Sequence, residues 1–333
     1  MAGRQHSFLT AVTKKIIHRG ERGGRRGKNS ALSAPSAVKK EKMTPITIRP
    51  LASHDDYQQT RHIHMMTWGV DAAETIPPLM VHALQHNGGT SLGAYDGDRL
   101  VGYVLGTLGT IQTPNRIDQI AAARLKMYSV IMGILPEYQN QGIGAQLKLA
   151  QREAALHQGI RLITWTYDPL ESRNGRLNIG KLGAVCHKYY RDFHGSMAGR
   201  NAGLASDRFE VEWWVTSNRV EGRVAQQRRP LSLDAMRGAG AIVVNEAHFD
   251  DAGLPIPPLE FAHSENNLIL VEIPAEIQAL KATDLALAKQ WRQHTRQLFE
   301  YYFAANFAVT DFVFQPGEDG RSRSFYLLTH HDS

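Results

Sequence analysis

Tyr128-Ser-Val-Ile-Met-Gly-Ile-Leu-Pro-Glu-Tyr-Gln-Asn-Gln-Gly-Ile-Gly-Ala-Gln-Leu147 is the stretch that decides the fold of this chain. It opens with an apolar, β-branched run that is typical of a buried strand, and Pro136 ends that strand. A short polar turn then leads to Gly142-Ile-Gly144, and apolar residues at helical spacing predict an amphipathic helix over 143–157. Small residues let backbone N–H groups approach a ligand closely, and the start of a helix carries partial positive charge. The stretch therefore predicts a binding site for a pyrophosphate group.

Two common phosphate-binding motifs are excluded by spacing. A dinucleotide-binding fingerprint needs a third glycine three residues after the second, where this chain has Leu147. A Walker A loop needs Gly-Lys-Ser/Thr, and the nearest approach, Gly27-Lys28, has Arg22 in place of the first glycine. The pattern that remains is Gln-x-x-Gly-x-Gly after a strand. A glycine-rich turn without a ligand is the simpler alternative, but the strand, the proline, the glutamine and the helix together favour a ligand.

This pattern resembles the acetyl-CoA loop of the GNAT superfamily of acyl-CoA N-acyltransferases. The usual form of that loop is Arg/Gln-x-x-Gly-x-Gly/Ala, and Gln139, Gly142 and Gly144 match it. A later stretch, 165–183, resembles a branch of predicted acetyltransferases in this superfamily that has a long carboxy-terminal extension and no well-defined substrate. The resemblance extends over residues 45–217.

The order of the predicted elements agrees with that resemblance. We predict strands at 46–51, 90–95, 100–108, 126–135, 160–167 and 209–215, and helices at 55–68, 143–157 and 177–193. The resemblance implies an α+β fold with a mixed, mostly antiparallel central sheet flanked by helices. It also implies that two parallel strands, 126–135 and 160–167, splay apart to admit the pantetheine arm of CoA.

Composition divides the chain into four parts. We expect a disordered basic tail over 1–43, an acyl-CoA-binding catalytic domain over 44–217, a loop-rich connection over 218–262 and a carboxy-terminal α/β region over 263–333. In the last part we predict strands at 267–273, 308–315 and 324–329 and a long helix over 274–303. The end of that helix, 298–307, weakly resembles residues 188–195, which suggests a degenerate GNAT-like half. The helix contains no glycine, so we expect a single cofactor site.

The net charge of +6 comes from the amino-terminal tail. Residues 1–42 hold eleven Lys and Arg against two Glu, whereas the rest of the chain holds 27 basic and 30 acidic residues. The folded part therefore gives no sign of a nucleic-acid surface. Met43 directly precedes the first predicted strand, so we expect the tail to lie upstream of the natural start or to lack a function, with a transit peptide or a basic arm as alternatives. We expect a cytoplasmic protein that does not bind membranes, because no apolar run approaches the length that spans a bilayer.

The resemblance implies acetyl-CoA as the cosubstrate and a set of residues that hold it. The backbone N–H of Ile134 would stabilise the oxyanion, and Met132 and Gly133 would line the pantetheine. Lys148 and Arg152 would reach phosphate oxygens, or else form a solvated helix face. The residues around the pyrophosphate would be Gln139, Asn140, Gln141, Gly142, Ile143, Gly144 and Ala145.

Acid and base candidates come from later in the chain. Family members often carry a tyrosine in a Tyr-Glu-Lys-Leu-Gly-Phe-like helix ending, and we match it to Tyr190, with Tyr189 as its neighbour. A phenol suits the protonation of a leaving thiolate of similar basicity. Asp168 and Glu171 follow the second splayed strand and are the candidates for the general base, although loop carboxylates more often cap helices or pair with arginine. The single cysteine, Cys186, falls in a predicted helix and is expected to pack in the core.

These observations predict a CoA-dependent N-acyltransferase. It would move an acetyl or other short acyl group to a primary amine on a small molecule, by direct attack within a ternary complex. The alternative is a catalytically silent acyl-CoA-binding or scaffold protein that keeps the same fold. No His, Asp and Glu residues have the spacing of metal ligands, so we expect no metal, and the sequence leaves the oligomeric state open.

Overall fold

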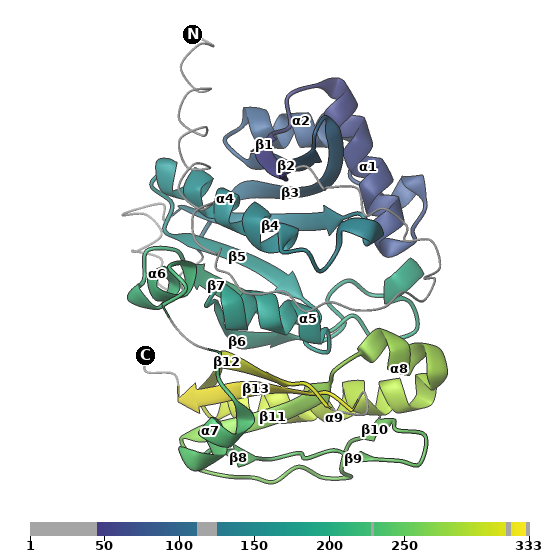
Figure 1. The fold of residues 1–333 in the computed structure, drawn as a ribbon, viewed down its shortest axis with the longest axis vertical. Helices are drawn as coiled ribbons and strands as arrows, with labels where there is room; N and C mark the ends of the chain where they lie inside the picture. Colours follow the sequence, from purple (N-terminus) through teal and green to yellow (C-terminus); the bar gives the residue numbers. More distant parts are fainter. Residues whose placement is uncertain (1–44, 112–124, 228–229, 318–320, 331–333) are drawn as a thin grey trace, which may run out of the picture.

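The computed structural model describes residues 45–111, 125–227, 230–317 and 321–330. The basic tail, with the expectations attached to it, lies outside these residues. Within them, one sheet of eleven strands runs through the whole molecule, from β1 at one end to β8 at the other (Figure 1). Helices flank this sheet, and none of those in the described part is long and apolar enough to cross a membrane.

The amino-terminal part of the sheet confirms the predicted fold class. Four successive strands pair antiparallel: β1 (Thr47–Pro50), β2 (Thr90–Asp96), β3 (Arg99–Thr110) and β4 (Leu125–Ile134). The next strand, β5 (Leu162–Tyr167), is parallel to β4. Beyond it lie β7 (Arg208–Trp214) and β6 (Val185–Tyr190), which are antiparallel to their neighbours. The sheet is therefore mixed and mostly antiparallel.

Local sequence explains the helices of this part. The side chain of Ser53 accepts a hydrogen bond from the backbone of Asp56 and so caps α1 (His54–Trp68), which Gly69 ends with a left-handed φ of 64°. Helix α4 (Ile143–His157) has the predicted bounds. Helix α2 (Pro78–His86) was not predicted; Pro78 at its first position is well suited to start a helix.

The predicted helix over 177–193 is wrong. Only two short pieces are helical here, α5 (Ser172–Gly175) and a π-helical turn, η4 (Arg176–Lys181). Gly183 then adopts a left-handed φ of 78° and the chain enters β6. Cys186, Tyr189 and Tyr190 therefore lie on a strand, although Cys186 is buried as expected.

Cross-strand charge explains why the segment forms a strand. Lys188 on β6 lies 3.4 Å from Glu210 and 3.2 Å from Glu212, both on β7. Such pairs stabilise a sheet but cannot be recognised from the periodicity of one segment.

The carboxy-terminal elements are largely as predicted. The three strands are β11 (Leu268–Pro274), β12 (Phe307–Gln315) and β13 (Arg323–His330). The long predicted helix is present as two, α8 (Ile277–Thr283) and α9 (Leu285–Ala304), because Asp284 between them caps the second. The predicted loop-rich connection also contains short elements: α6 (Asn218–Val224), α7 (Leu233–Gly238), β8 (Ile242–Val243), β9 (His248–Phe249) and β10 (Pro255–Ile256).

Two adjacent parts of the sheet repeat each other in order and direction. In the first unit, β4 is parallel to β5, a helical segment follows, and β7 lies between β5 and β6. In the second, β8 is parallel to β11, helices follow, and β13 lies between β11 and β12. The units meet where β6 pairs antiparallel with β12. The second unit differs in one respect: its segment 244–267 contains no helix in the place of α4.

The helix-to-strand junctions of the two units also match. Gly183, with a φ of 78°, precedes β6, and Asn306, with a φ of 62°, precedes β12. Glycine and asparagine are the residues that most readily adopt this conformation. The junction at Asn306 therefore corresponds to Gly183, and not to residues 188–195 as the sequence comparison suggested.

Aromatic packing joins the units into one core. The ring of Phe209 on β7 lies 5.8 Å from that of Tyr167 on β5, 4.7 Å from Phe299 on α9 and 5.4 Å from Tyr326 on β13. All four residues are buried. The carboxy-terminal unit thus covers strands that belong to the predicted catalytic domain.

Candidate functional site

β4 and β5 splay apart, as predicted. Their parallel pairing is confined to Met127 with Ile163 and Tyr128 with Thr164. Beyond these pairs β4 continues to Ile134 and β5 to Tyr167 without pairing to each other. A gap therefore opens between the strands toward their carboxyl ends.

The backbone of Ile134 points into this gap. The next residue, Leu135, donates its N–H to the carbonyl of Val101 on the β3 side at 2.9 Å. Because hydrogen-bonding direction alternates along an antiparallel pair, the N–H and C=O of Ile134 point away from β3. The Ile134 carbonyl accepts hydrogen bonds from Thr67 Oγ1 at 3.2 Å and Gln139 Nε2 at 3.0 Å.

The glycine turn lies at the end of this strand. Gly142 has a left-handed φ of 81° and precedes the first residue of α4, and a Cβ built on it would meet nothing within 4 Å. A Cβ on Gly144 would lie 3.3 Å from Met132 and 3.4 Å from Ile134. The small residues thus leave the start of α4 open on one side and let it pack closely on β4 on the other.

Arg173 completes this turn and was missed as a binding residue in the sequence. Its Nη1 lies 3.2 Å from Asn140 Oδ1 and 3.5 Å from Gln139 Oε1. Arg173 lies on α5, which follows β5, whereas the turn follows β4. The fold therefore brings the arginine to the turn from a separate part of the chain. It supplies a guanidinium group beside the open helix start.

Lys148 and Arg152 do not reach the turn. Lys148 is buried, with Nζ 2.7 Å from Ser129 Oγ, 3.2 Å from Gln151 Oε1 and 3.7 Å from the centre of the Trp165 ring. Burial lowers its pKa well below the usual value. Arg152 donates to the carbonyl of Val215 and to Glu153. Both predicted phosphate contacts are therefore wrong, because these side chains turn toward the sheet.

His64 lies on the other face of β4. Its Nδ1 is 3.4 Å from the hydroxyl of Tyr103, and its ring is 4.6 Å from that of Trp68. A Cβ on Gly133 would lie 2.9 Å from the Tyr103 ring and 3.2 Å from Trp68, so these side chains cover the glycine. Burial lowers the pKa of His64, which favours a neutral imidazole. The spacing of His64 in the sequence carries no indication that it lies beside β4.

Tyr190 lies away from the gap. It is on β6, and β7 separates β6 from β5, which at the usual strand spacing puts it about 10 Å from β5. Its ring is 5.3 Å from Phe193, and burial is the main cause that raises its pKa. Tyr189 points to the aromatic core instead and donates to Asp207 Oδ2 at 2.5 Å.

The structure also changes the match to the family's helix ending. Lys181-Leu182-Gly183 reproduces the Lys-Leu-Gly of that ending and stands where the π-helical turn ends. The position of the family tyrosine is then occupied by Ile179, which is buried.

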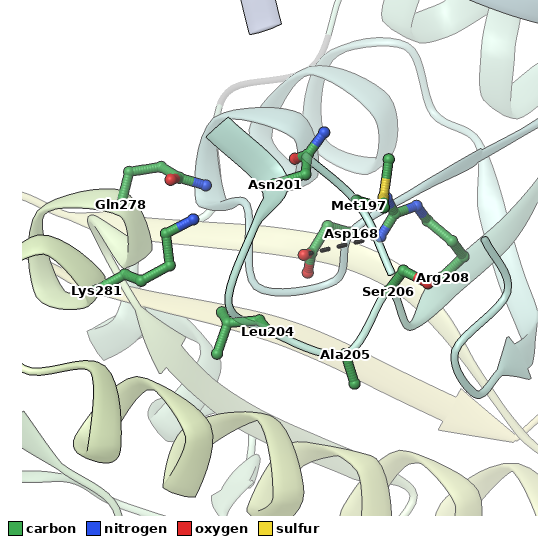
Figure 2. Close-up of a pocket in the computed structure, with 9 residues that line it drawn as sticks. All are labelled: Asp168, Met197, Asn201, Leu204, Ala205, Ser206, Arg208, Gln278 and Lys281. Atoms are coloured by element: carbon green, nitrogen blue, oxygen red, sulfur yellow. Dashed lines mark hydrogen bonds and ion pairs between the residues drawn. The ribbon is translucent and has the colours of Figure 1, made fainter. Parts of the chain in front are cut away.

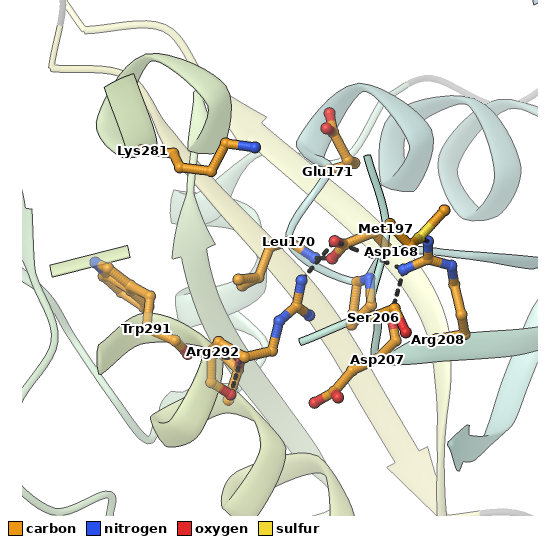
Figure 3. A network of polar contacts seen from close by, with 12 residues as sticks. Asp168, Leu170, Glu171, Met197, Ser206, Asp207, Arg208, Lys281, Trp291 and Arg292 are labelled. Carbon is orange, nitrogen blue, oxygen red and sulfur yellow. Dashed lines mark hydrogen bonds and ion pairs between the residues drawn. The ribbon is translucent and has the colours of Figure 1, made fainter. Parts of the chain in front are cut away.

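Asp168 and Glu171 belong to a network of ion pairs at the carboxyl end of β5 (Figure 3). Asp168 lies 2.5 Å from Arg292 Nη2 on α9 and 3.9 Å from Arg208 Nη1 on β7. Glu171 accepts a hydrogen bond from Gln278 Nε2 at 2.6 Å and lies 3.7 Å from Arg200. The structure thus brings both base candidates together, but in contact with side chains of the carboxy-terminal unit and of the loop 191–207.

A small pocket adjoins this network (Figure 2). Its cavity volume is about 10 Å³, roughly the room that one water molecule needs, and it opens to solvent. Gln278 and Lys281 reach toward Asp168 and Arg208 from α8, and Asn201 lies on the loop. No group of His, Cys, Asp and Glu suited to a metal ion occurs among the residues that the structure describes.

Comparisons with known proteins bear on this arrangement. The sequence model of the acetyltransferase (GNAT) family matches residues 57–174. Among solved structures, yncA from Salmonella typhimurium with acetyl-CoA is 18% identical, with a TM-score of 0.40, and the match covers 52% of this chain and 95% of that one. Arabidopsis thaliana NAA60 with acetyl-CoA is 14% identical, with a TM-score of 0.41 and coverage of 51% and 99%. No curated protein matches the sequence.

The matched residues 57–174 include β4, the glycine turn, α4 and β5, which together form the gap. The described sheet is mixed and mostly antiparallel, with β4 and β5 parallel and splayed, as the resemblance implied. Residues 57–174 therefore match the acetyltransferase (GNAT) family in sequence.

Proposed function

We propose that this protein is a CoA-dependent N-acyltransferase that moves an acetyl or short acyl group from acyl-CoA to a primary amine by direct attack. The observation that carries the proposal is the gap between β4 and β5, with the Ile134 backbone directed into it and the open glycine turn at its mouth.

The residues present suit a bound acyl-CoA. The backbone N–H groups at the start of α4 suit a pyrophosphate, with Arg173 beside them, although the N–H of Ala145 already donates to the carbonyl of Gly142 at 3.1 Å. The side chains of Met132 and Ile134 lie beside Gly144 of α4 and suit the pantetheine arm, while Gly133 faces α1. Acyl-CoA supplies the activated acyl group, and the Ile134 N–H is placed to stabilise an oxyanion that forms on it.

The attacking amine needs a base. His64, neutral because of its lowered pKa, is a candidate that the structure adds to Asp168 and Glu171. Asp168 already pairs with Arg292. We therefore assign its carboxylate to holding side chains of the ion-pair network in position. A direct proton transfer needs heavy atoms about 3 Å apart. The distance of Tyr190 from β5 therefore argues against its role as the acid.

Two measurements test the proposal. Calorimetric titration with acetyl-CoA reports binding, and release of CoA over a panel of primary amines reports transfer. Arg173→Gln should weaken acetyl-CoA binding about tenfold through the loss of a charge-assisted contact. The matched control is Arg237→Gln, because Arg237 pairs with Glu246 on the carboxy-terminal unit.

The outcomes separate the two candidate functions. Binding of acetyl-CoA with transfer to an amine supports the proposal. Tight binding without transfer to any amine favours the silent acyl-CoA-binding protein. A protein that does not bind acetyl-CoA at all has neither function.

A further inference from the structure

The loop 191–207 lines the pocket of Figure 2 and also contacts the end of α1. Gly199 of this loop, with a left-handed φ of 56°, is packed so closely on the end of α1 that a Cβ would lie 2.2 Å from the carbonyl of Trp68. Thr67, in the same turn of α1, donates to the carbonyl of Ile134. The loop thus leads from the end of α1, which contacts Ile134, to β7. The pocket that it lines includes Asp168, directly after β5, and so lies at the same end of the sheet as Ile134.

Basic groups outnumber acidic ones around this pocket. Two carboxylates, Asp168 and Glu171, face four basic side chains, namely Arg200, Arg208, Lys281 and Arg292. A third carboxylate, Asp207, does not change the balance, because Arg296 binds it with two hydrogen bonds of 2.7 and 2.8 Å.

Arg292 lacks partners for most of its guanidinium group. The side chain is only 3% exposed, and its Nη2 donates to Asp168. Its Nε and Nη1 have no hydrogen-bond partner among the described residues. Buried polar groups normally have partners, and a buried guanidinium without them is costly.

Arg208 is also incompletely paired. It donates Nη1 to the backbone carbonyl of Asp207 at 2.9 Å, whereas the acceptor for Nη2 is the thioether of Met197 at 3.1 Å. A thioether is a weak acceptor. Both arginines therefore share one carboxylate, Asp168, and a second anion would satisfy them better.

We propose that this pocket binds an anionic group, a carboxylate or a phosphate, on the acceptor molecule whose amine receives the acyl group. The inference rests on the proposed function and names the class of acceptor. Arg208 and Lys281 line the pocket and would contact the anion, with Arg292 behind Asp168 adding positive charge. The amine of the same small molecule would then extend toward the gap.

Equilibrium binding tests the inference without the need for turnover. Calorimetric titrations in the presence of CoA compare glycine, alanine, leucine, phenylalanine and glutamate with their carboxamides, and O-phosphoethanolamine with ethanolamine. We expect at least one anionic amine to bind ten times or more as tightly as its neutral counterpart. The amino-acid arm and the phosphate arm distinguish the two kinds of anion.

Two variants and a control locate the effect. Arg208→Gln should weaken binding of the preferred anionic amine by about 10- to 100-fold, and Lys281→Gln by about 3- to 10-fold, with no change for the neutral amine. Lys281 is half-buried on α8, where its Nζ donates to the carbonyls of Arg200 and Ala202 at 2.5 and 2.9 Å, and it provides a second variant if Arg208→Gln does not fold. Arg237→Gln should bind every amine like the wild type.

Each result decides the question. Equal binding of anionic and neutral amines, or no binding of any of them, overturns the inference. Acyl transfer to neutral amines without preference overturns it as well but leaves the N-acyltransferase function standing. A preference for anionic amines in binding without any acyl transfer keeps the pocket and overturns the proposed function.

Discussion

Gly142 lies in the glycine turn. Its substitution distinguishes the effect of backbone strain on stability from the effect of the turn on acetyl-CoA binding. Its φ of 81° is unfavourable for any residue with a Cβ, but the space around it is open. Gly240, which follows α7 in the carboxy-terminal unit, has a φ of 87° and is equally open. The two glycines thus form a matched pair, one at the proposed cofactor site and one far from it.

Gly142→Ala and Gly240→Ala should each lower the free energy of unfolding by about 1–2 kcal/mol, because both place a Cβ in a left-handed conformation. Only Gly142→Ala should weaken acetyl-CoA binding, by about tenfold, since it shifts the N–H groups that face the phosphates. Urea unfolding and calorimetric titration measure the two effects. Equal affinities in the two variants would mean that the cofactor does not bind at this turn.

His294 predicts a dependence of stability on pH. Burial among Trp291 and Phe261 lowers its pKa to about 4, and its Nε2 has no partner among the described residues. The unfolded state therefore binds a proton near pH 6.5, whereas the folded state does so only near pH 4. Stability is full above pH 6.5 and falls as the pH decreases through this interval.

We expect this loss to be on the order of 2 kcal/mol, allowing for partial solvation of the ring. His294→Phe should remove it, while the exposed His62→Gln should leave it in place. Urea unfolding at pH 7 and pH 4.5 measures the difference between the variants. The same loss in His294→Phe as in the wild type would assign the pH dependence to other groups.

At the scale of elements, local signals decided what the sequence predicts correctly. The capping box at Ser53, the Asp-Gly-Asp hairpin turn at 96–98 and the amphipathic run of α4 each lie within one segment. Such signals need no knowledge of the rest of the fold. β6 was mistaken for a helix because its stability comes from pairing with β7 and β12, which belong to distant parts of the sequence.

The same distinction applies to the candidate site. The glycine turn is contiguous in the sequence and was recognised there. Arg173, His64 and Arg292 reach the site from three separate helices, so only the folded chain brings them there. The predicted roles of Lys148 and Arg152 failed because the sequence shows that a residue is on a helix, not which way a long side chain turns.

At the scale of the whole molecule, the carboxy-terminal unit protects a sheet edge. Without it, β6 would present unpaired backbone groups, and the rings of Tyr167 and Phe209 would lose their contacts with Tyr326 and Phe299. Exposed edges and aromatic surface of this kind promote association.

A chain that ends at residue 217 should therefore be insoluble or elute as a larger species in size-exclusion chromatography. The full chain is the control, and multi-angle light scattering gives the mass of each species. A truncated chain that stays monomeric and melts at the same temperature as the full chain would show that the second unit does not stabilise the first.

The second unit repeats the first, with β8, β11, β12 and β13 in the places of β4, β5, β6 and β7. This repeat also bears on how such a chain would arise. Copying of one gene segment and fusion of the copy to its source would produce this arrangement, with like edges joined at β6 and β12. Two identical subunits pair like surfaces in the same way when they form a two-fold dimer. In those terms the chain carries its own partner: the first unit holds the glycine turn, and the second contributes Arg292, Gln278 and Lys281 to the surroundings of Asp168 and Glu171.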